Sequence, residues 1–343
     1  MDAKITKTRI SRILSYDWLK IVIASVVAIV VWSLVFTMSA TRITPAQQFT
    51  VFNYVGNVGF MGTEFNKLYE KAYKDNVFSY EVLELTQEDL ATNKEYAGTL
   101  MQARTAVEEG DVIFVADIDN PDTAKRDDKG EIIGYERTYI ESLIWGYRAY
   151  FYELDPEKEG SFFYKMEAYL DEFYTSGWEN EESLNQDKVK SEFRKRVKKD
   201  KRFKTEAQLL QGEKDDIARI EKYRDALEQF YAWLDEGIIS FTTTTLSDGE
   251  TTLEGVFTIN LCPDESKTGG LKKYVAYNEI VIEDANVETG EAGKTHYVQT
   301  AKNMNVGFFN YRGVEEGFQY ESLLFVNYVI ENALVATQEM AQK

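Results

Sequence analysis

The chain has 343 residues, a formal net charge of −19 and 44% hydrophobic residues, so it is long and apolar enough to bury a core. The acidic excess lacks the basic footprint that phosphate binding requires, so we expect no nucleic acid among its partners. The single cysteine, Cys262, excludes an intrachain disulfide framework and a Cys-rich metal site. We expect the single histidine, His296, in a polar loop. Histidine is the commonest catalytic base and zinc ligand, so both roles lack their commonest residue in this chain. We expect neither a metal nor a cofactor.

An apolar segment near the start predicts a transmembrane helix. Residues 21–41 contain no charged side chain. A run of about 18 apolar residues spans the roughly 30 Å hydrocarbon core as a helix, which satisfies its own backbone groups. A cleaved signal peptide is the alternative, but its apolar region is about 7–15 residues long and ends in a small-x-small site. This run is longer and contains Trp32, so we expect residues 21–41 to be an uncleaved membrane anchor.

The flanking charges predict the orientation of that anchor. Residues 1–20 hold five Lys or Arg residues against two Asp residues, a charge of +3, which leaves −22 for the rest of the chain. An excess of Lys and Arg marks the cytoplasmic side of a span. We therefore expect residues 1–20 to be a cytoplasmic basic segment. The large acidic part is expected to be extracytoplasmic, on a single-pass protein of the cell membrane.

Residues 48–118 have the pattern of a β-α-β-α-β unit. Three apolar stretches are predicted strands: 49–54, 77–85 and 111–118. One helix is expected from Thr63, and another over 96–109, ending at Gly110 as a C-cap. Continuous apolar strands that alternate with helices indicate a parallel sheet covered on both faces.

Residues 119–237 are polar at first and then mostly helical. The polar loop over 119–135 contains a Lys-Gly turn that is typical of a small hairpin. Apolar residues at helical spacing predict helices within 140–151, 162–173 and 214–236. A basic run from Lys188 to Arg202 holds nine Lys or Arg residues against two acidic ones. It is either a solvated helix face or a surface for anionic lipid headgroups, wall polymers or an acidic partner.

The remainder, residues 238–343, returns to the period of two that is typical of strands and closes with a helix. The stretches 239–246 and 253–261 flank a Ser-Asp-Gly turn and predict a hairpin. The other expected elements are strands over 271–277 and 306–309 and a helix over 319–340.

Several segments carry a resemblance to a known family. They are Phe49 to Gly62, Glu108 to Val115, and the strand with Asn260 followed by Gly270-Leu271 and Tyr274 to Tyr277. In this order they resemble the extracellular solute-binding proteins of bacterial ABC transporters, in particular the sugar-binding type. In that family, strands from the beginning of the chain and strands from its end together build the sheet of the first lobe. The resemblance implies an α/β fold: a three-layer α/β/α lobe from residues 48–118 and 238–343, with the helical insert 119–237 forming a second lobe.

Ligands of open α/β sheets bind beyond the carboxyl ends of the strands. Tyr54 ends the first predicted strand and Asn57 follows it, and Asp117 and Asp119 lie at the end of the third. We expect these four side chains to contact a small polar ligand through hydrogen bonds. Two structural alternatives stay open: a tight glycine turn around Asn57, and a solvated turn with an Asx cap after Asp119.

Three tryptophans are candidates for stacking on a sugar ring. Trp145 and Trp233 lie on predicted helices with apolar neighbours, so we expect them in the core. Trp178 lies in a polar stretch after Gly177 and is the better candidate for a ligand contact.

The motifs predict a protein that is not an enzyme. The sequence contains no nucleophile elbow, no H-E-x-x-H and no P-loop. Carboxylate-only glycoside hydrolysis is a distant alternative, because a pair of Asp or Glu residues suffices for it. The leading hypothesis is an extracytoplasmic binding or sensing domain that acts beside a transporter or receptor for sugars or other polar solutes. The alternative is a cell-envelope scaffold or interaction protein with a degenerate solute-binding fold.

Overall fold

The computed structural model describes residues 18–39, 47–54, 63–79, 82–90, 94–247, 252–274, 278–281, 295–298, 303–311 and 317–342. The chain divides into two compact units, Met1–Ile43 and Thr44–Lys343. Each unit is described by itself.

The first unit contains one apolar helix. Helix α2, Trp18–Ser39, begins three residues before the predicted span and ends two residues before its end. It is long and apolar enough to cross a membrane, and it is the one such helix in the part of the chain that the structure describes. Its side chains from Trp18 to Phe36 are exposed.

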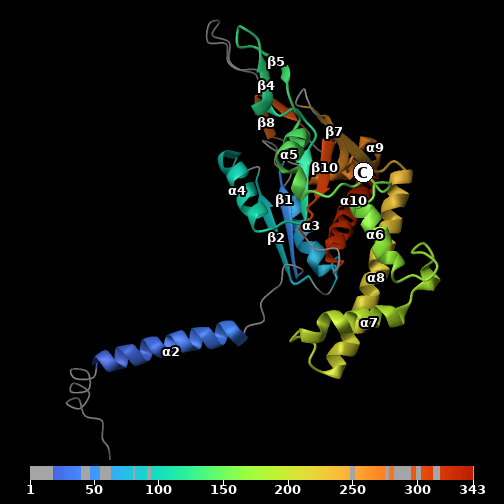
Figure 1. The fold of residues 1–343 in the computed structure, drawn as a ribbon. Coiled ribbons are helices and arrows are strands. Elements are labelled where there is room, and N and C mark those ends of the chain that lie inside the picture. Colours follow the sequence, from blue (N-terminus) through green and yellow to red (C-terminus); the bar gives the residue numbers. More distant parts are fainter. Residues whose placement is uncertain are drawn as a thin grey trace, which may run out of the picture. The chain divides into compact units, whose positions relative to one another are not determined.

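The second unit is built on a six-stranded mixed sheet (Figure 1). Its strands, in spatial order, are β2 (Glu84–Asp89), β1 (Gln48–Asn53), β3 (Val112–Ala116), β10 (Met304–Phe308), β7 (Thr252–Asn260) and β6 (Ser240–Ser247). β1 pairs in parallel with both β2 and β3, whereas the pairs β3–β10, β10–β7 and β7–β6 are antiparallel. Four of the six strands therefore point the same way, and β10 and β6 are reversed. The predicted hairpin over 239–261 is confirmed as β6 and β7.

Helices cover both faces of this sheet. Alternate residues of a strand point to opposite faces, so the apolar side chains of each strand enter two separate clusters. Phe49 and Leu323 belong to one cluster of buried residues, the α10-side core. Its helices are α3 (Thr63–Lys74), α6 (Phe162–Asp171), α8 (Glu206–Asp235) and α10 (Glu321–Ala341). Phe52 and Leu143 belong to another cluster, the α5-side core. Its helices are α4 (Lys94–Ala106) and α5 (Tyr139–Tyr147). The predicted α/β class is confirmed, with helical layers on both sides of the sheet (Figure 1).

The helical segment 119–237 packs onto the sheet as part of the same unit. Phe163 of α6 and Phe230 of α8 lie in the α10-side core together with Val306 of β10. The predicted small hairpin is confirmed as β4 (Ala124–Arg126) and β5 (Ile132–Tyr135). The remaining helix, α7, spans Gln186–Arg196 and packs against α8.

Helix α8 begins earlier than the predicted residue 214. Thr205 caps it, because its hydroxyl accepts a hydrogen bond from Gln208 N, while the Gln208 side chain accepts one from Thr205 N. This capping box satisfies two backbone donors of the first turn. Apolar periodicity is weak in that turn, so the cap sets the start of the helix.

The second predicted strand, 77–85, is mostly wrong. The second strand along the chain is β2, Glu84–Asp89, a polar edge strand that pairs with β1. Val77, Phe78 and Val82 do pack in the α10-side core, but outside any strand. Their apolar pattern correctly indicates that these side chains are buried. It does not indicate which backbone segment pairs with β1, because that depends on the tertiary arrangement.

Two further differences concern the later part of the chain. Residues 271–273, predicted as the start of a strand, lie in the 3-10 helix η6 (Gly269–Lys273), which follows the short helix α9 (Glu265–Thr268). Residues 275–277 of that prediction lie outside the described residues. His296, expected in a loop, lies in β9 (Thr295–Val298) and pairs with Ile280 of β8 (Asn278–Val281).

We expect the substitution Gly270→Ala to destabilise the second unit. A Cβ atom at Gly270 would lie 1.9 Å from Ala333 O and 2.7 Å from Thr337 N of helix α10. Backbone atoms cannot yield without moving that helix, so we expect a loss of about 1–3 kcal/mol or more. Thermal unfolding of the full-length protein, followed by circular dichroism, measures this loss.

Gly98→Ala is the matched control. No heavy atom lies within 4 Å of a Cβ atom at Gly98, in the middle of helix α4. Alanine is the better helix former there, by about 0.5–1 kcal/mol. If Gly270→Ala unfolded at the wild-type temperature, the close approach of η6 to α10 would be refuted.

Candidate functional site

The order of the strands places a topological switch point between β1 and β3. The chain leaves β1 for β2 on one side and returns to β3 on the other side. Such points open a crevice beyond the carboxyl ends of the two strands, because the connections on either side diverge. Asn53, which ends β1, lies beside Phe114 of β3, and Tyr54 N donates a 2.7 Å hydrogen bond to Phe114 O.

Asn53 is a polar residue of this edge that sequence reasoning missed. Its side chain is fully buried, and its Nδ2 donates a 3.2 Å hydrogen bond to Asp89 Oδ1 at the end of β2. Its Oδ1 accepts no hydrogen bond from the described part of the chain. A buried acceptor without a donor costs about 1–3 kcal/mol. The available signal was an amide at the end of the apolar stretch Phe-Thr-Val-Phe.

Tyr54 lies next to Asn53 and is half-buried. Burial raises the pKa of its phenol, and the nearby Tyr147 and Asp122 raise that pKa further. Tyr54 and Tyr147 of α5 both pack against the α5-side core, and Asp122 of the 3-10 helix η2 (Pro121–Thr123) lies within electrostatic range of the phenol. The phenol stays protonated at neutral pH, so it is able to donate a hydrogen bond at this edge.

The two predicted carboxylates follow β3. Asp117 is half-buried, and its N donates a 2.7 Å hydrogen bond to Asn303 O just before β10. Asp119 is exposed and forms an isolated bridge with Thr138, the N-cap of α5. Neither carboxylate makes a hydrogen bond or an ion pair within residues 94–247 or the other described ranges. No three His, Cys, Asp or Glu side chains gather as a metal-binding group in those ranges.

The Asx-cap reading of the following turn is confirmed. Asn120 Oδ1 accepts a 3.0 Å hydrogen bond from Asp122 N, and its Nδ2 donates a 2.9 Å hydrogen bond to Ser142 Oγ of α5. The turn is therefore fixed to α5, which holds the backbone after Asp119 in place.

Of the other two predicted ligand contacts, the structure describes only Trp178. Asn57 lies in residues 55–62, outside the described residues. Trp178 packs against the α10-side core, with its ring 6.2 Å from that of Tyr231. Tyr54 packs against the α5-side core, on the opposite face of the sheet. The structure thus brings Tyr54, Asp117 and Asp119 to neighbouring strand ends and leaves Trp178 on the other side.

The other two tryptophans differ in their outcome. Trp233 is 7% exposed, as predicted for a core residue. Trp145 is 45% exposed, so its predicted core position is wrong. The guanidinium carbon of Arg137 lies 4.3 Å from the centre of its ring, and this cation–π contact stabilises an exposed indole.

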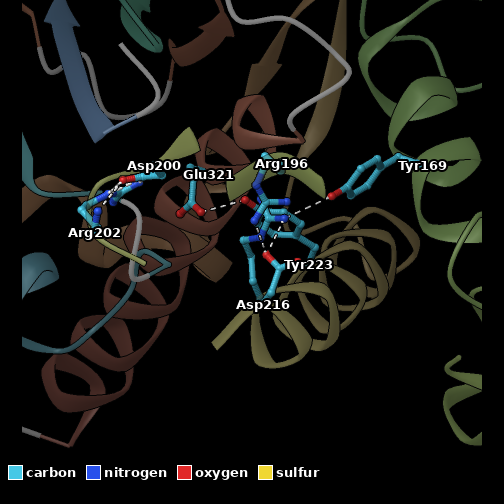
Figure 2. Close-up of polar contacts among 8 residues, drawn as sticks. Tyr169, Arg196, Asp200, Arg202, Asp216, Tyr223 and Glu321 are labelled. Carbon is cyan, nitrogen blue, oxygen red and sulfur yellow. Dashed lines mark hydrogen bonds and ion pairs between the residues drawn. The ribbon is translucent and has the colours of Figure 1, made fainter. Parts of the chain in front are cut away.

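The arginines of the basic run are used inside the unit (Figure 2). Arg196 Nη2 and Arg219 Nη2 lie 2.7 and 2.8 Å from the same oxygen of Asp216, Oδ1. The Arg219 side chain is 0% exposed and that of Asp216 is 3% exposed. A buried charge is tolerated only when it is paired and hydrogen-bonded, so this cluster ties α7 to α8.

A second buried contact in Figure 2 joins α8 to α10. Tyr223 Oη donates a 2.7 Å hydrogen bond to Glu321 Oε1, and Ser79 N donates a 3.0 Å hydrogen bond to Glu321 Oε2. Burial, and next the Glu321 carboxylate, raise the pKa of Tyr223 well above its usual value. The contact fixes the segment before β2 against both helices.

We expect Asp216→Ala to destabilise the protein by about 3–5 kcal/mol, because it removes the carboxylate that two guanidinium groups share in a buried place. Chemical unfolding of the full-length protein measures the difference. Asp187→Ala is the control, because the Asp187 side chain is 98% exposed and pairs with Lys190 only at 3.6 Å. Its cost is expected to stay within about 0.5 kcal/mol. Equal costs for both variants would contradict the structural role of Asp216.

Comparisons with known proteins identify no family or function for the chain. No family model, no curated protein and no solved structure matches the chain. The function is therefore argued from the residues of the switch point and from the chain's own organisation.

Proposed function

We propose that the chain is a membrane-anchored binding or sensing protein. Helix α2 would anchor it, and the large unit would lie outside the cytoplasm and bind a small polar solute, such as a sugar, beside a transporter or receptor. The observation that carries this proposal is the switch point between β1 and β3. Polar groups of two neighbouring strand ends lie there: the Tyr54 phenol and the Asp117 carboxylate, and the buried, unsatisfied Asn53 Oδ1, which alternates to the opposite face of the sheet from Tyr54.

The chemistry of these groups fits a ligand rich in hydroxyl groups. An amide oxygen and a carboxylate accept hydrogen bonds, and a protonated phenol donates one. Ligand sites combine a few polar groups that fix orientation with apolar or aromatic walls. Tyr54 and Tyr147 supply aromatic surface on the α5 side of the sheet, and a carboxylate such as that of Asp117 is the strongest type of acceptor.

The connectivity of the sheet supports the same proposal. Strands β1, β2 and β3 come from the first part of the large unit, and β6, β7 and β10 come from its last part. A sheet that is entered from both ends of the chain is a property of the solute-binding proteins that the sequence resembles. The proposed activity is binding, without a chemical reaction.

A scaffold function is the second candidate, and one observation favours it. The α10-side core runs without a break from Phe49 of β1 through Phe163 of α6 to Val189 of α7. Proteins that close around a solute move two bodies about a hinge, whereas a shared core keeps its parts fixed. A scaffold of the cell envelope would use such a rigid unit to bind another protein.

A ligand screen on the full-length protein in detergent or nanodiscs tests the proposal. Sugars, oligosaccharides and amino acids are added while thermal unfolding is followed. A ligand at about 100 times its dissociation constant stabilises the fold by roughly 2.7 kcal/mol. With the ligand found, we expect Asp117→Asn to weaken binding at least about tenfold, because a hydrogen bond to a charged group contributes roughly 1.5–3 kcal/mol.

Asp128→Asn is the matched control for this charge change. Asp128 is exposed in the turn between β4 and β5, away from the strand ends of β1 and β3. Its substitution is expected to leave the affinity unchanged. No stabilisation by any compound in the screen would contradict solute binding and favour the scaffold.

A further inference from the structure

The basic run ends in four exposed lysines that the arginine network leaves out. Ten Lys or Arg residues lie between Lys188 and Lys204. Five of them form ion pairs with carboxylates: Lys190, Arg194, Lys195, Arg196 and Arg202. Lys188 lies over the ring of Phe173. The other four, Lys198, Lys199, Lys201 and Lys204, form the lysine corner between α7 and α8.

The lysine corner is free to bind an anion. All four side chains are exposed, and none makes an ion pair or hydrogen bond with another residue of the described ranges. Leu210, in the second turn of α8, is 48% exposed. Leu210 follows Lys204 by six residues in the sequence, and exposed lysines together with exposed apolar side chains are the combination that binds the interface of an anionic membrane.

The corner projects beyond the amino edge of the sheet. At that edge Leu83 N donates a hydrogen bond to Gln47 O, and Lys222 of α8 donates one of 3.2 Å to Val77 O nearby. From Lys222 back to Glu206, α8 continues for 16 residues, or about 24 Å. Figure 1 shows α7 and the start of α8 beyond the amino ends of β1 and β2.

The chain also enters the sheet at this amino edge. Residues 40–46 separate Ser39, the end of α2, from Gln47, and seven residues span at most about 25 Å. The chain after residue 20 carries a charge of −22 and is repelled by anionic lipid. The lysine corner is a positively charged part of this acidic unit. It lies toward the edge of the sheet at which the chain enters after residues 40–46.

We propose that the lysine corner binds the anionic phospholipid headgroups of the membrane that α2 crosses. The contact orients the large unit, so that its amino edge faces the lipid and the carboxyl ends of β1 and β3 face away from it. The proposal rests on the membrane anchor of the proposed function and is independent of the solute site.

A fluorescence experiment on the full chain tests this contact. A membrane-impermeant maleimide fluorophore is attached to the L210C variant, because Leu210 is exposed and the native Cys262 is fully buried. The protein is reconstituted in vesicles that contain a lipid with a quencher at its headgroup. We expect strong quenching with phosphatidylglycerol present and little with phosphatidylcholine alone. Salt should reverse it, since the Debye length falls from about 10 Å at 0.1 M to about 3 Å at 1 M.

Two pairs of substitutions give a matched comparison. K198Q/K199Q should lower the ratio of docked to undocked molecules by roughly 25-fold, because each lysine near an anionic surface contributes about a fivefold factor. K125Q/K129Q, in the exposed β4–β5 hairpin, should leave that ratio unchanged.

Several results would overturn the proposal. One is equal quenching in both lipid compositions, and another is an equal loss of quenching with both pairs of lysine substitutions. A third is no quenching at all, which would favour an acidic protein as the partner. Release of the chain by alkaline washing would refute the anchor and the lipid contact together. Loss of quenching in a chain that stays embedded would refute the lipid contact alone.

Discussion

The antiparallel pairing of β3 with β10 is the constraint on which the rest of the large unit depends. It sets Ala116 beside Met304. The long segment between these two residues therefore leaves the sheet and returns to it at neighbouring positions. That segment must then return its apolar side chains to the same sheet. Phe163 and Phe230 do so in the α10-side core, and Leu143 does so in the α5-side core. Layering on both faces follows from this closure.

The parallel pairing of β1 with β2 on one side and β3 on the other creates the candidate site. Because β2 and β3 lie on opposite sides of β1, the carboxyl end of β1 is a topological switch point, where open α/β sheets bind their ligands. Asn53 and Tyr54 occupy that end, with Asp117 at the end of β3. Asn53 Oδ1 is unsatisfied, in contrast to the amide of Asn120, whose oxygen and nitrogen each make a hydrogen bond that fixes a turn. This contrast separates the residues that build the edge from those that are able to bind.

Positive charge in the segment 188–204 has two distinct uses. The arginines form forked contacts with carboxylates, and Arg219 of α8 completes a buried cluster with Arg196 and Asp216. A guanidinium suits such places because it is planar and weakly hydrated. The lysines stay in solvent, where a strongly hydrated ammonium loses little free energy. The first group holds α7 on α8, and the second forms the surface that we propose for lipid.

The sequence by itself determined the elements whose pattern is local. An uncharged apolar run defined α2, continuous apolar stretches defined β1 and β3, and turn residues defined the hairpins β4–β5 and β6–β7. Only the tertiary structure decided the polar edge strand β2, the 3-10 turn at Gly270 against α10, the burial of Arg219 and the exposure of Trp145. It also revealed Asn53, whose free Oδ1 is visible only beside Asp89. Apolar periodicity reports which side chains leave water, but pairing partners and close approaches are set by segments far away along the chain.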